Sequence, residues 1–292
     1  MMKKKSIGLL LTVLLVVAAL AGCSSGSGGN KTVKLAYVAW DSEIASTYVV
    51  KEVLESKLDM SVEMLQVDAG PMWAGIADGS ADAMVAAWLP STHASYLEQY
   101  GSKLEDLGPN LDGTKTGLAV PTYMDINSIE DLNNAELAGT LQNRIVGIEP
   151  GAGIMMATEK AIEAYGLSDY TLLESSSAAM VQELEKSYQN NQPIVVTGWT
   201  PHWMFANMDL KYLEDPQAVY GGAEQIHTMV RTGLNEDMPE VYSFLDQFNW
   251  TPEDMEQVMV DIAGGQSPED AAKKWVDGHE EQVNAWIASA HE

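Results

Sequence analysis

Two stretches of this chain share one order of apolar and helical segments, and this internal repeat limits the possible folds more than any other feature. Trp40 and Trp88 are 48 residues apart, and Pro150 and Trp199, at the matching positions, are 49 apart. Strands that alternate with helices form parallel sheets, so the repeat predicts an α/β fold with two lobes of similar build. The apolar runs typical of strands lie at 33–40, 61–67 and 82–88 in the first copy, and at 144–150, 170–175 and 193–199 in the second.

Three of the predicted strands end in tryptophan, at Trp40, Trp88 and Trp199. Two of these tryptophans begin similar segments, WLPSTH at 88–93 and WTPH at 199–202, each a Trp-x-Pro with a histidine close behind. Ligands of open α/β sheets bind at the carboxyl ends of strands, where all three tryptophans are expected. A single tryptophan at such a place is more often a core residue. Three in matching contexts predict a cage of indole faces, which suits a quaternary ammonium cation that has no hydrogen to donate.

The segment PGAGIM at 150–155 joins a predicted strand to a predicted helix. Gly151 and Gly153 allow a ligand to approach the backbone closely, and the start of the helix offers free N–H groups to an anion. The segment contains neither GK[ST] nor G-x-G-x-x-G, so it is not a phosphate loop or a dinucleotide motif. An anionic end of the ligand is therefore expected here.

Residues 1–22 have the pattern of a targeting segment, with Lys3, Lys4 and Lys5 before a short apolar run. LAGC at 20–23 resembles a bacterial lipobox, in which Cys23 becomes the lipidated first residue; the alternative is an ordinary secretory signal with an incidental cysteine. Cys23 is the only cysteine of the chain, which excludes an intrachain disulfide. Residues 23–31 are rich in serine and glycine and predict a flexible tether.

The chain has 16 basic and 42 acidic residues, a formal net charge of −26. Three of the lysines belong to the targeting segment, so its removal takes the charge to −29. Such a charge argues against binding nucleic acid or anionic lipid through a basic patch, although it does not identify the ligand.

The rest of the chain is expected to connect and complete the two lobes. The runs 116–124 and 226–234 are interpreted as crossings between lobes, and the helical tail is assigned to the first lobe. Thr251 and Ser267, each followed by proline and two acids, predict helix N-caps in this tail. The predicted lobes are 32–121 plus 229–292, and 122–228.

Several segments together resemble the glycine betaine-binding proteins of bacterial ABC importers. In that family the two halves occur in either order, and here the half with VAWDSEIAS comes first. The resemblance implies a two-lobed class II solute-binding fold, in which each lobe is a mainly parallel sheet flanked by helices and the ligand lies in the cleft between lobes. The segments are VAWDSEIAS, QVDAGPMW, GSADAMVAAWLPSTH, GIEPGAGIM, and SSSAAM with PIVVTGWTPHWMF, and they span nearly all of residues 33–290.

The resemblance also assigns roles to particular residues. It implies that Trp40, Trp88 and Trp199 surround the trimethylammonium group of the ligand, and that His93 and the amides of Gly153 and Ile154 bind its carboxylate. No cofactor or metal is implied, and the expected partners are an ABC permease with its ATPase and, through the anchor, the outer face of the cell membrane. The remaining residues of interest are assigned to structure: Trp73, Trp203, Trp250, Trp275, Trp286 and His202, with Asp41 and Glu43 interpreted as caps of the next helix.

Other functions stay open at this point. An enzyme is disfavoured, because the chain has no G-x-S-x-G elbow, no HExxH motif and no set of cysteine ligands. The cage also accommodates proline betaine, carnitine, choline or a sulfonium analogue, and the sequence does not exclude a sensory or adhesion module with the same fold and no importer. The carboxylate donors argue against choline as the best ligand.

Overall fold

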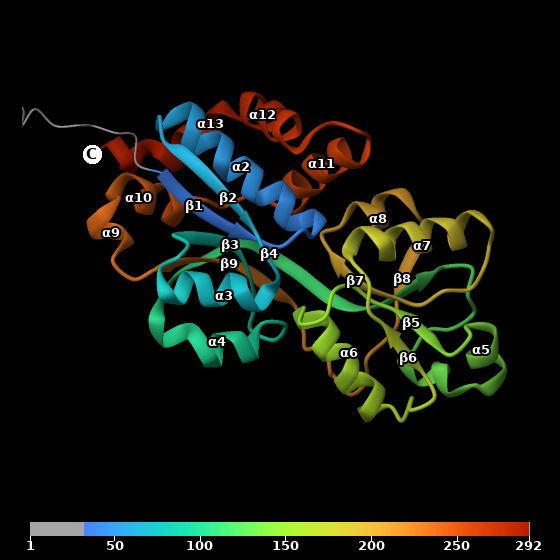
Figure 1. The fold of residues 1–292 in the computed structure, drawn as a ribbon. Coiled ribbons are helices and arrows are strands. Elements are labelled where there is room, and N and C mark those ends of the chain that lie inside the picture. The colour runs from blue at the N-terminus through green and yellow to red at the C-terminus, as the bar shows by residue number, and fades with distance from the viewer. Residues whose placement is uncertain (1–31, 292) are drawn as a thin grey trace, which may run out of the picture. The chain divides into compact units, whose positions relative to one another are not determined.

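The computed structural model describes residues 32–291, so the targeting segment, Cys23 and the tether at 23–31 lie outside the described residues. Strands and helices alternate through most of this range (Figure 1). The strands are β1 (Thr32–Tyr37), β2 (Ser61–Gln66), β3 (Ala83–Leu89), β4 (Leu104–Pro121), β5 (Arg144–Val146), β6 (Thr171–Leu173), β7 (Val196–Thr200), β8 (Leu210–Tyr212) and β9 (Glu224–Arg231). The α-helices are α2 (Asp41–Lys57), α3 (Ala69–Asp78), α4 (Ala94–Tyr100), α5 (Ala135–Thr140), α6 (Gly153–Ala164), α7 (Ser177–Gln189), α8 (Trp203–Asn207), α9 (Leu234–Asp237), α10 (Pro239–Gln247), α11 (Pro252–Ala263), α12 (Pro268–Gly278) and α13 (Glu280–Ile287). Short 3₁₀ turns lie at Gly101–Lys103, Ile129–Asn133 and Ala288–His291.

The internal repeat predicted from the sequence is confirmed. In the first copy β1 is parallel to both β2 and β3, and in the second β5 is parallel to both β6 and β7. Within residues 32–291 the strand order is β2-β1-β3-β9-β4-β7-β5-β6, with β8 paired to β4. The two copies therefore form the two ends of one mixed sheet, and the antiparallel pairs come from the strands that connect them.

The connection between the copies differs from the expected one. The first part of β4, up to Thr114, pairs with β9, and its second part, from Lys115 to Ala119, pairs with β7. The strand itself thus joins the two halves, and the join begins before residue 116. The run 226–234, expected to be the return crossing, instead forms β9 between β3 and β4, so the chain has returned before Glu224. Strand β4 pairs with strands of both halves, so strand pairing does not mark a boundary between lobes. The predicted lobe boundaries therefore stay a prediction.

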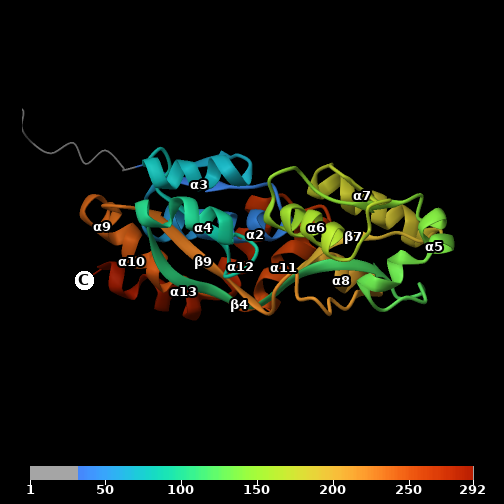
Figure 2. The ribbon, with the colours of Figure 1, turned by 90° about the horizontal axis from the view of Figure 1, so that it is seen from below.

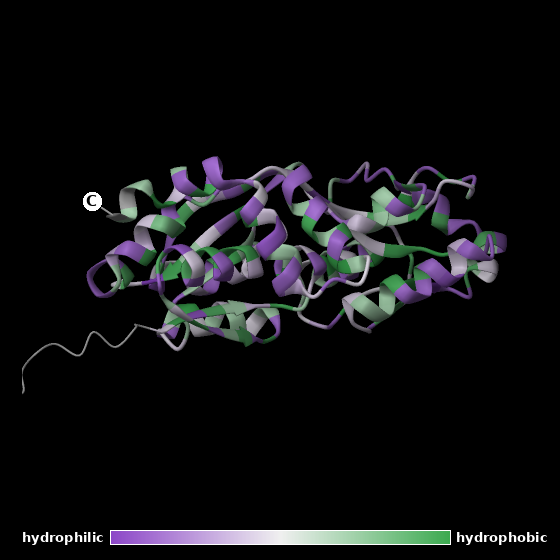
Figure 3. Cartoon of the chain, turned by 90° about the horizontal axis from the view of Figure 1, so that it is seen from above, coloured by the Kyte–Doolittle hydropathy of each residue, from purple (hydrophilic) through white to green (hydrophobic). Residues whose placement is uncertain are grey.

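Helices cover both faces of the sheet (Figures 1 and 2). On one face of the first half, α11 and α12 from the tail pack on α2, while α3 and α4 cover the other face. Most of these helices alternate hydrophilic and hydrophobic residues along the ribbon, as expected when one side packs inward (Figure 3). No helix in the described part of the chain combines the length and the apolarity needed to cross a membrane.

The tail helices begin where the sequence predicted. Thr251 accepts a hydrogen bond from the N–H of Asp254 at 3.2 Å, and Ser267 accepts one from the N–H of Asp270 at 3.1 Å. In the helices of this tail, the indole rings of Trp275 and Trp286 stack, with ring centres 5.7 Å apart. The three tryptophans of the predicted cage are buried, and so are the five assigned to structure: Trp73, Trp203, Trp250, Trp275 and Trp286.

Candidate functional site

One pocket brings together every residue that the sequence analysis placed at the ligand. Trp40 precedes α2, Trp88 and Trp199 lie near the ends of β3 and β7, and all three are almost completely buried. The pocket also receives residues that sequence reasoning did not single out. Its lining consists of Trp40, Trp88, Thr92, His93, Thr116, Ile148, Ala152, Gly153, Ile154 and Trp199.

The two Trp-x-Pro segments share their backbone geometry. The bonds Leu89–Pro90 and Thr200–Pro201 are both cis, in strands that belong to different copies of the repeat. The similarity seen in the sequence thus extends to the turn that follows each tryptophan.

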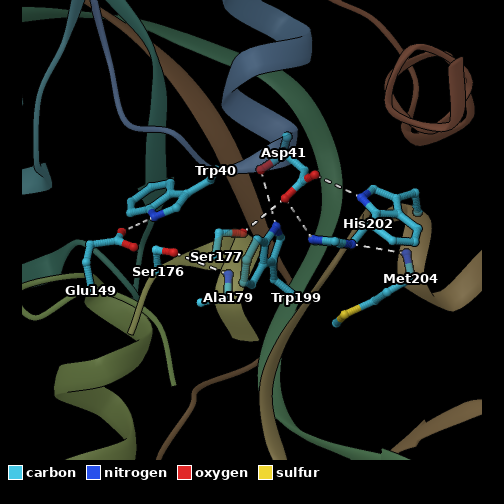
Figure 4. A network of polar contacts seen from close by, with 11 residues as sticks. Trp40, Asp41, Glu149, Ser176, Ser177, Ala179, Trp199, His202 and Met204 are labelled. Atoms are coloured by element: carbon cyan, nitrogen blue, oxygen red, sulfur yellow. Dashed lines mark hydrogen bonds and ion pairs between the residues drawn. The ribbon is translucent and has the colours of Figure 1, made fainter. Parts of the chain in front are cut away.

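Each indole N–H of the cage donates to a polar side chain of the protein. Trp88 Nε1 donates to Oε1 of Glu43 at 2.9 Å, and Trp199 Nε1 donates to the hydroxyl of Ser42 at 3.2 Å. Trp40 Nε1 donates to the carboxylate of Glu149, as Figure 4 shows. These bonds fix the orientation of the rings and occupy their only donors. What remains for a ligand is the aromatic faces.

Two of these partners, Ser42 and Glu43, are completely buried. Burial raises the pKa of the Glu43 carboxyl to about 8, although the hydrogen bond from Trp88 acts in the opposite direction. The group is therefore mainly neutral at pH 7, and its second oxygen, Oε2, has no partner within residues 32–291. The interpretation of Asp41 and Glu43 as helix caps is wrong, because Trp40 occupies the N-cap position of α2 and no side chain caps this helix. Both carboxyl groups bond indole N–H groups instead.

His93 is completely buried beside the cage. Its Nδ1 accepts the backbone N–H of Trp88 at 3.0 Å, so the proton of the neutral ring lies on Nε2. Burial lowers the pKa of His93 to about 3, which keeps the ring neutral at physiological pH. Trp40, Trp73 and Tyr96 pack around it, each with its ring centre 5.8 Å away. Nε2 is buried and has no partner in the described part of the chain, so its N–H is free for a ligand.

The start of α6 supplies further donors to the same pocket. The first N–H groups of a helix have no carbonyl partner within it, and Ala152, at the N-cap of α6, makes no side-chain capping bond. Gly153 and Ile154 are the first two residues of this helix and line the pocket. A Cβ on Gly153 would collide with the carbonyl oxygen of Thr92, so glycine is required where the two segments meet.

Glu224 supports the loop that carries His93, a role that sequence reasoning missed. Its Oε1 accepts the N–H groups of Ser91 at 2.7 Å and Thr92 at 2.8 Å, and its Oε2 accepts the Thr92 hydroxyl. Glu224 is far from this loop in the sequence, and no motif marks it. Thr92, in contrast, lies inside the PSTH segment and could have been suspected from its place between Trp88 and His93.

The fold and the pocket define a two-lobed α/β solute-binding protein, with a pocket lined by residues from both halves of the molecule. Residues 31–278 match the family described as the substrate binding domain of ABC-type glycine betaine transport systems, and the chain belongs to this family.

Individual relatives agree with this assignment. The chain is 52% identical over 153 residues to the glycine betaine/carnitine transport binding protein GbuC of Listeria monocytogenes, a match that covers 52% of this chain and 51% of that protein. The match thus spans about half the length of that relative. Lactococcal OpuAC, in its closed-liganded conformation with glycine betaine, is 46% identical with a TM-score of 0.84, over 88% of this chain and 99% of that one. A choline-binding protein of an ABC transporter, in complex with choline, is 26% identical with a TM-score of 0.83, over 90% and 94%.

Proposed function

We propose that this chain captures glycine betaine, or a related betaine such as proline betaine, outside the cell membrane and delivers it to an ABC permease and its ATPase for osmoprotectant uptake. One observation carries the proposal. The pocket has aromatic faces from Trp40, Trp88 and Trp199, and it also has unpartnered donors at His93 and at the start of α6. Such a pocket matches a zwitterion with a quaternary ammonium group and a carboxylate.

The cage suits the ammonium end for an electrostatic reason. A trimethylammonium group carries charge but no N–H, so hydrogen-bond acceptors serve it poorly, whereas an indole face attracts the charge and buries the methyl groups. Each desolvated contact contributes about 2 kcal/mol, and three contribute several kcal/mol before the cost of ordering and closing the site.

The carboxylate end is bound without a charged partner. The amides of Gly153 and Ile154 lie at the positive end of the α6 dipole, and the neutral His93 ring offers its Nε2 hydrogen. These donors form charge-assisted hydrogen bonds with a carboxylate, whereas their hydrogen bonds with the uncharged hydroxyl of choline would be weaker. Glycine betaine is therefore expected to bind more tightly than choline.

Choline is the main alternative ligand, and the similarity to a choline-binding protein favours considering it. Carnitine is a second alternative, because the Listeria relative carries that solute in its name. A sensory module with the same fold, without a permease, is a further possibility. No catalytic residue is proposed.

Calorimetric titration of the purified protein with several solutes tests the proposed function. The panel is glycine betaine, proline betaine, carnitine, choline and, as a control without a quaternary nitrogen, proline. We expect glycine betaine or proline betaine to bind most tightly, choline at least about tenfold more weakly, and proline not to bind measurably. Equal or tighter binding of choline would reject the betaine assignment in favour of the alternative.

We also propose that a lipid on Cys23 holds the protein at the outer face of the membrane. The lipobox-like LAGC before Cys23 and the serine- and glycine-rich tether after it support this. Cys23→Ala should release the protein from membranes while betaine binding in vitro is unchanged. A variant that resists a carbonate wash as firmly as the wild type would show that the anchor lies elsewhere.

A further inference from the structure

Asp41, the first residue of α2, is contacted by three side chains from the other copy of the repeat. Helix α2 packs on β1, β2 and β3 and on the tail helices, so Asp41 belongs to the first half of the molecule. Its partners belong to the second half. Ser177 begins α7, His202 lies between β7 and α8, and Trp203 begins α8.

Two of the contacts are hydrogen bonds of good length. Trp203 Nε1 donates to Oδ1 of Asp41 at 2.8 Å, and the hydroxyl of Ser177 donates to Oδ2 at 3.0 Å. His202 Nε2 lies 3.5 Å from Oδ2, which is long for a hydrogen bond, so we count it as the weakest of the three. Figure 4 shows the carboxylate of Asp41 between Ser177 and His202.

The contact with His202 extends to the cage itself. His202 Nδ1 accepts the backbone N–H of Met204 at 3.1 Å, so the proton of the neutral ring is on Nε2, which lies near Asp41 but makes no hydrogen bond within residues 32–291. The edge of the imidazole meets the ring of Trp199, with ring centres 4.7 Å apart and planes at 79°. Burial alone would favour the neutral form of Asp41, but the contacts from His202, Trp203 and Ser177 outweigh it and lower the pKa of Asp41 below its ordinary value. The contacts are thus made to an ionised carboxylate.

Asp41 differs in two respects from its neighbour Glu43. Asp41 does not line the pocket, and all three of these partners belong to the second copy. Glu43, two residues further along the same helix, bonds Trp88, which belongs to the first copy with it. A contact within one half survives when two halves separate, whereas contacts between halves do not.

We propose that Asp41 is a latch that holds the two lobes closed over a bound solute without touching that solute. The proposal rests on the proposed function, because it takes the pocket described above as the closed, ligand-binding form. Charge-assisted hydrogen bonds that exist only in the closed form shift the equilibrium toward it and slow ligand release. They contribute nothing to the open form, in which their partners are apart.

Asp41→Asn tests the latch, because asparagine keeps the size of the side chain and removes its charge. We expect the affinity for glycine betaine to fall by about tenfold or more, mainly through faster dissociation measured by stopped-flow tryptophan fluorescence. Asp41→Asn should lower the melting temperature more in the presence of betaine than in its absence. Trp203→Phe, which keeps an aromatic ring but removes the N–H donor, should reproduce part of the effect. In combination with Asp41→Asn it should add less than it does alone.

Asp131→Asn is the matched control. Asp131 accepts the N–H groups of Asn127 and Ser128, all within the predicted second lobe. This variant should lower the melting temperature equally with and without ligand and leave dissociation unchanged. The latch is rejected if Asp41→Asn behaves like this control, or if it binds and releases betaine like the wild type.

Small-angle scattering without ligand separates the latch from the proposed function. A latch predicts a larger radius of gyration for ligand-free Asp41→Asn than for the wild type, because the closed form is less populated. If the wild type binds no betaine but this difference is found, the proposed function fails and the latch stands. If the wild type binds betaine and Asp41→Asn shows neither this difference nor faster dissociation, the latch fails and the function stands.

Discussion

The backbone N–H of Trp88 donates to Nδ1 of His93 across 3.0 Å, so a tryptophan of the cage fixes the tautomer of the histidine expected at the other end of the ligand. This bond places the single proton of the neutral ring on Nε2, which has no partner among residues 32–291. Trp88, expected at the ammonium end of the proposed ligand, and His93, expected at its carboxylate end, therefore hold each other in place.

Removal of a cage tryptophan should weaken betaine binding. For Trp40→Ala, Trp88→Ala or Trp199→Ala we expect a loss of more than about tenfold each, equivalent to about 1.4 kcal/mol or more, measured by calorimetric titration. Phenylalanine at the same positions should cost less, since it keeps an aromatic face. Trp286→Phe, in the tail core, serves as a control that should lower stability and leave affinity unchanged. Folded alanine variants that bind like the wild type would remove the basis for the cage.

His93→Ala should change selectivity rather than abolish binding. One hydrogen bond to the carboxylate is lost, about 0.5–1.5 kcal/mol, or up to about 3 kcal/mol because the acceptor is charged. Glycine betaine affinity should fall between several-fold and about a hundredfold, while weak choline binding, which lacks a carboxylate, should hardly change. Parallel titrations with both solutes measure the ratio. Equal losses for the two would indicate that His93 merely supports the loop behind Trp88.

The neutral state of His93 predicts how binding and stability depend on pH. Burial lowers the pKa of His93 to about 3, from an ordinary value of 6.5. The unfolded chain therefore binds more protons than the folded one between these values, and this group should reduce stability as pH falls from 6.5 toward 3. Betaine affinity should not decline as pH rises from 6 to 8. A decline centred near pH 6.5 that disappears in His93→Gln would mean that the ring binds as a cation.

Glu43 should give the opposite pH dependence of stability. Burial raises the pKa of Glu43 to about 8, from an ordinary value of 4.5. Above pH 4.5 the unfolded chain releases a proton that the folded chain keeps, so stability falls with rising pH up to about 8, by an amount on the order of a few kcal/mol. Glu43→Gln keeps an oxygen for the Trp88 N–H and removes this dependence. Its melting temperature relative to the wild type should be higher at pH 8 than at pH 5, and an equal difference at both would contradict the assignment.

The sequence was sufficient to predict the repeat and six of the residues that meet at the pocket, because both depend on local signals. Strand ends are visible as apolar runs, and the Trp-x-Pro and PGAGIM segments mark their positions along the chain. The partners of the indoles were not predictable in this way. Asp41 and Glu43 lie in the first turn of a helix, where acids usually stabilise the dipole, and only packing between distant segments turns them toward Trp203 and Trp88.

The supporting groups and the return connection escaped prediction for the same physical reason. Glu224 reaches Ser91 and Thr92 because β9 lies beside β3, and this antiparallel pairing joins strands that are far apart in the chain. The apolar run at 226–234 has the same appearance whether it crosses between lobes or fills a place in the sheet. Strand order decides between these arrangements, and periodicity carries no information about it.

A crystal structure of the protein with glycine betaine tests the central claim most directly. We expect the trimethylammonium group to lie against the ring faces of Trp40, Trp88 and Trp199. The carboxylate oxygens should accept hydrogen bonds from the amides of Gly153 and Ile154 and from Nε2 of His93. Betaine bound outside this pocket, or bound within it with the carboxylate among the indoles, would contradict the account.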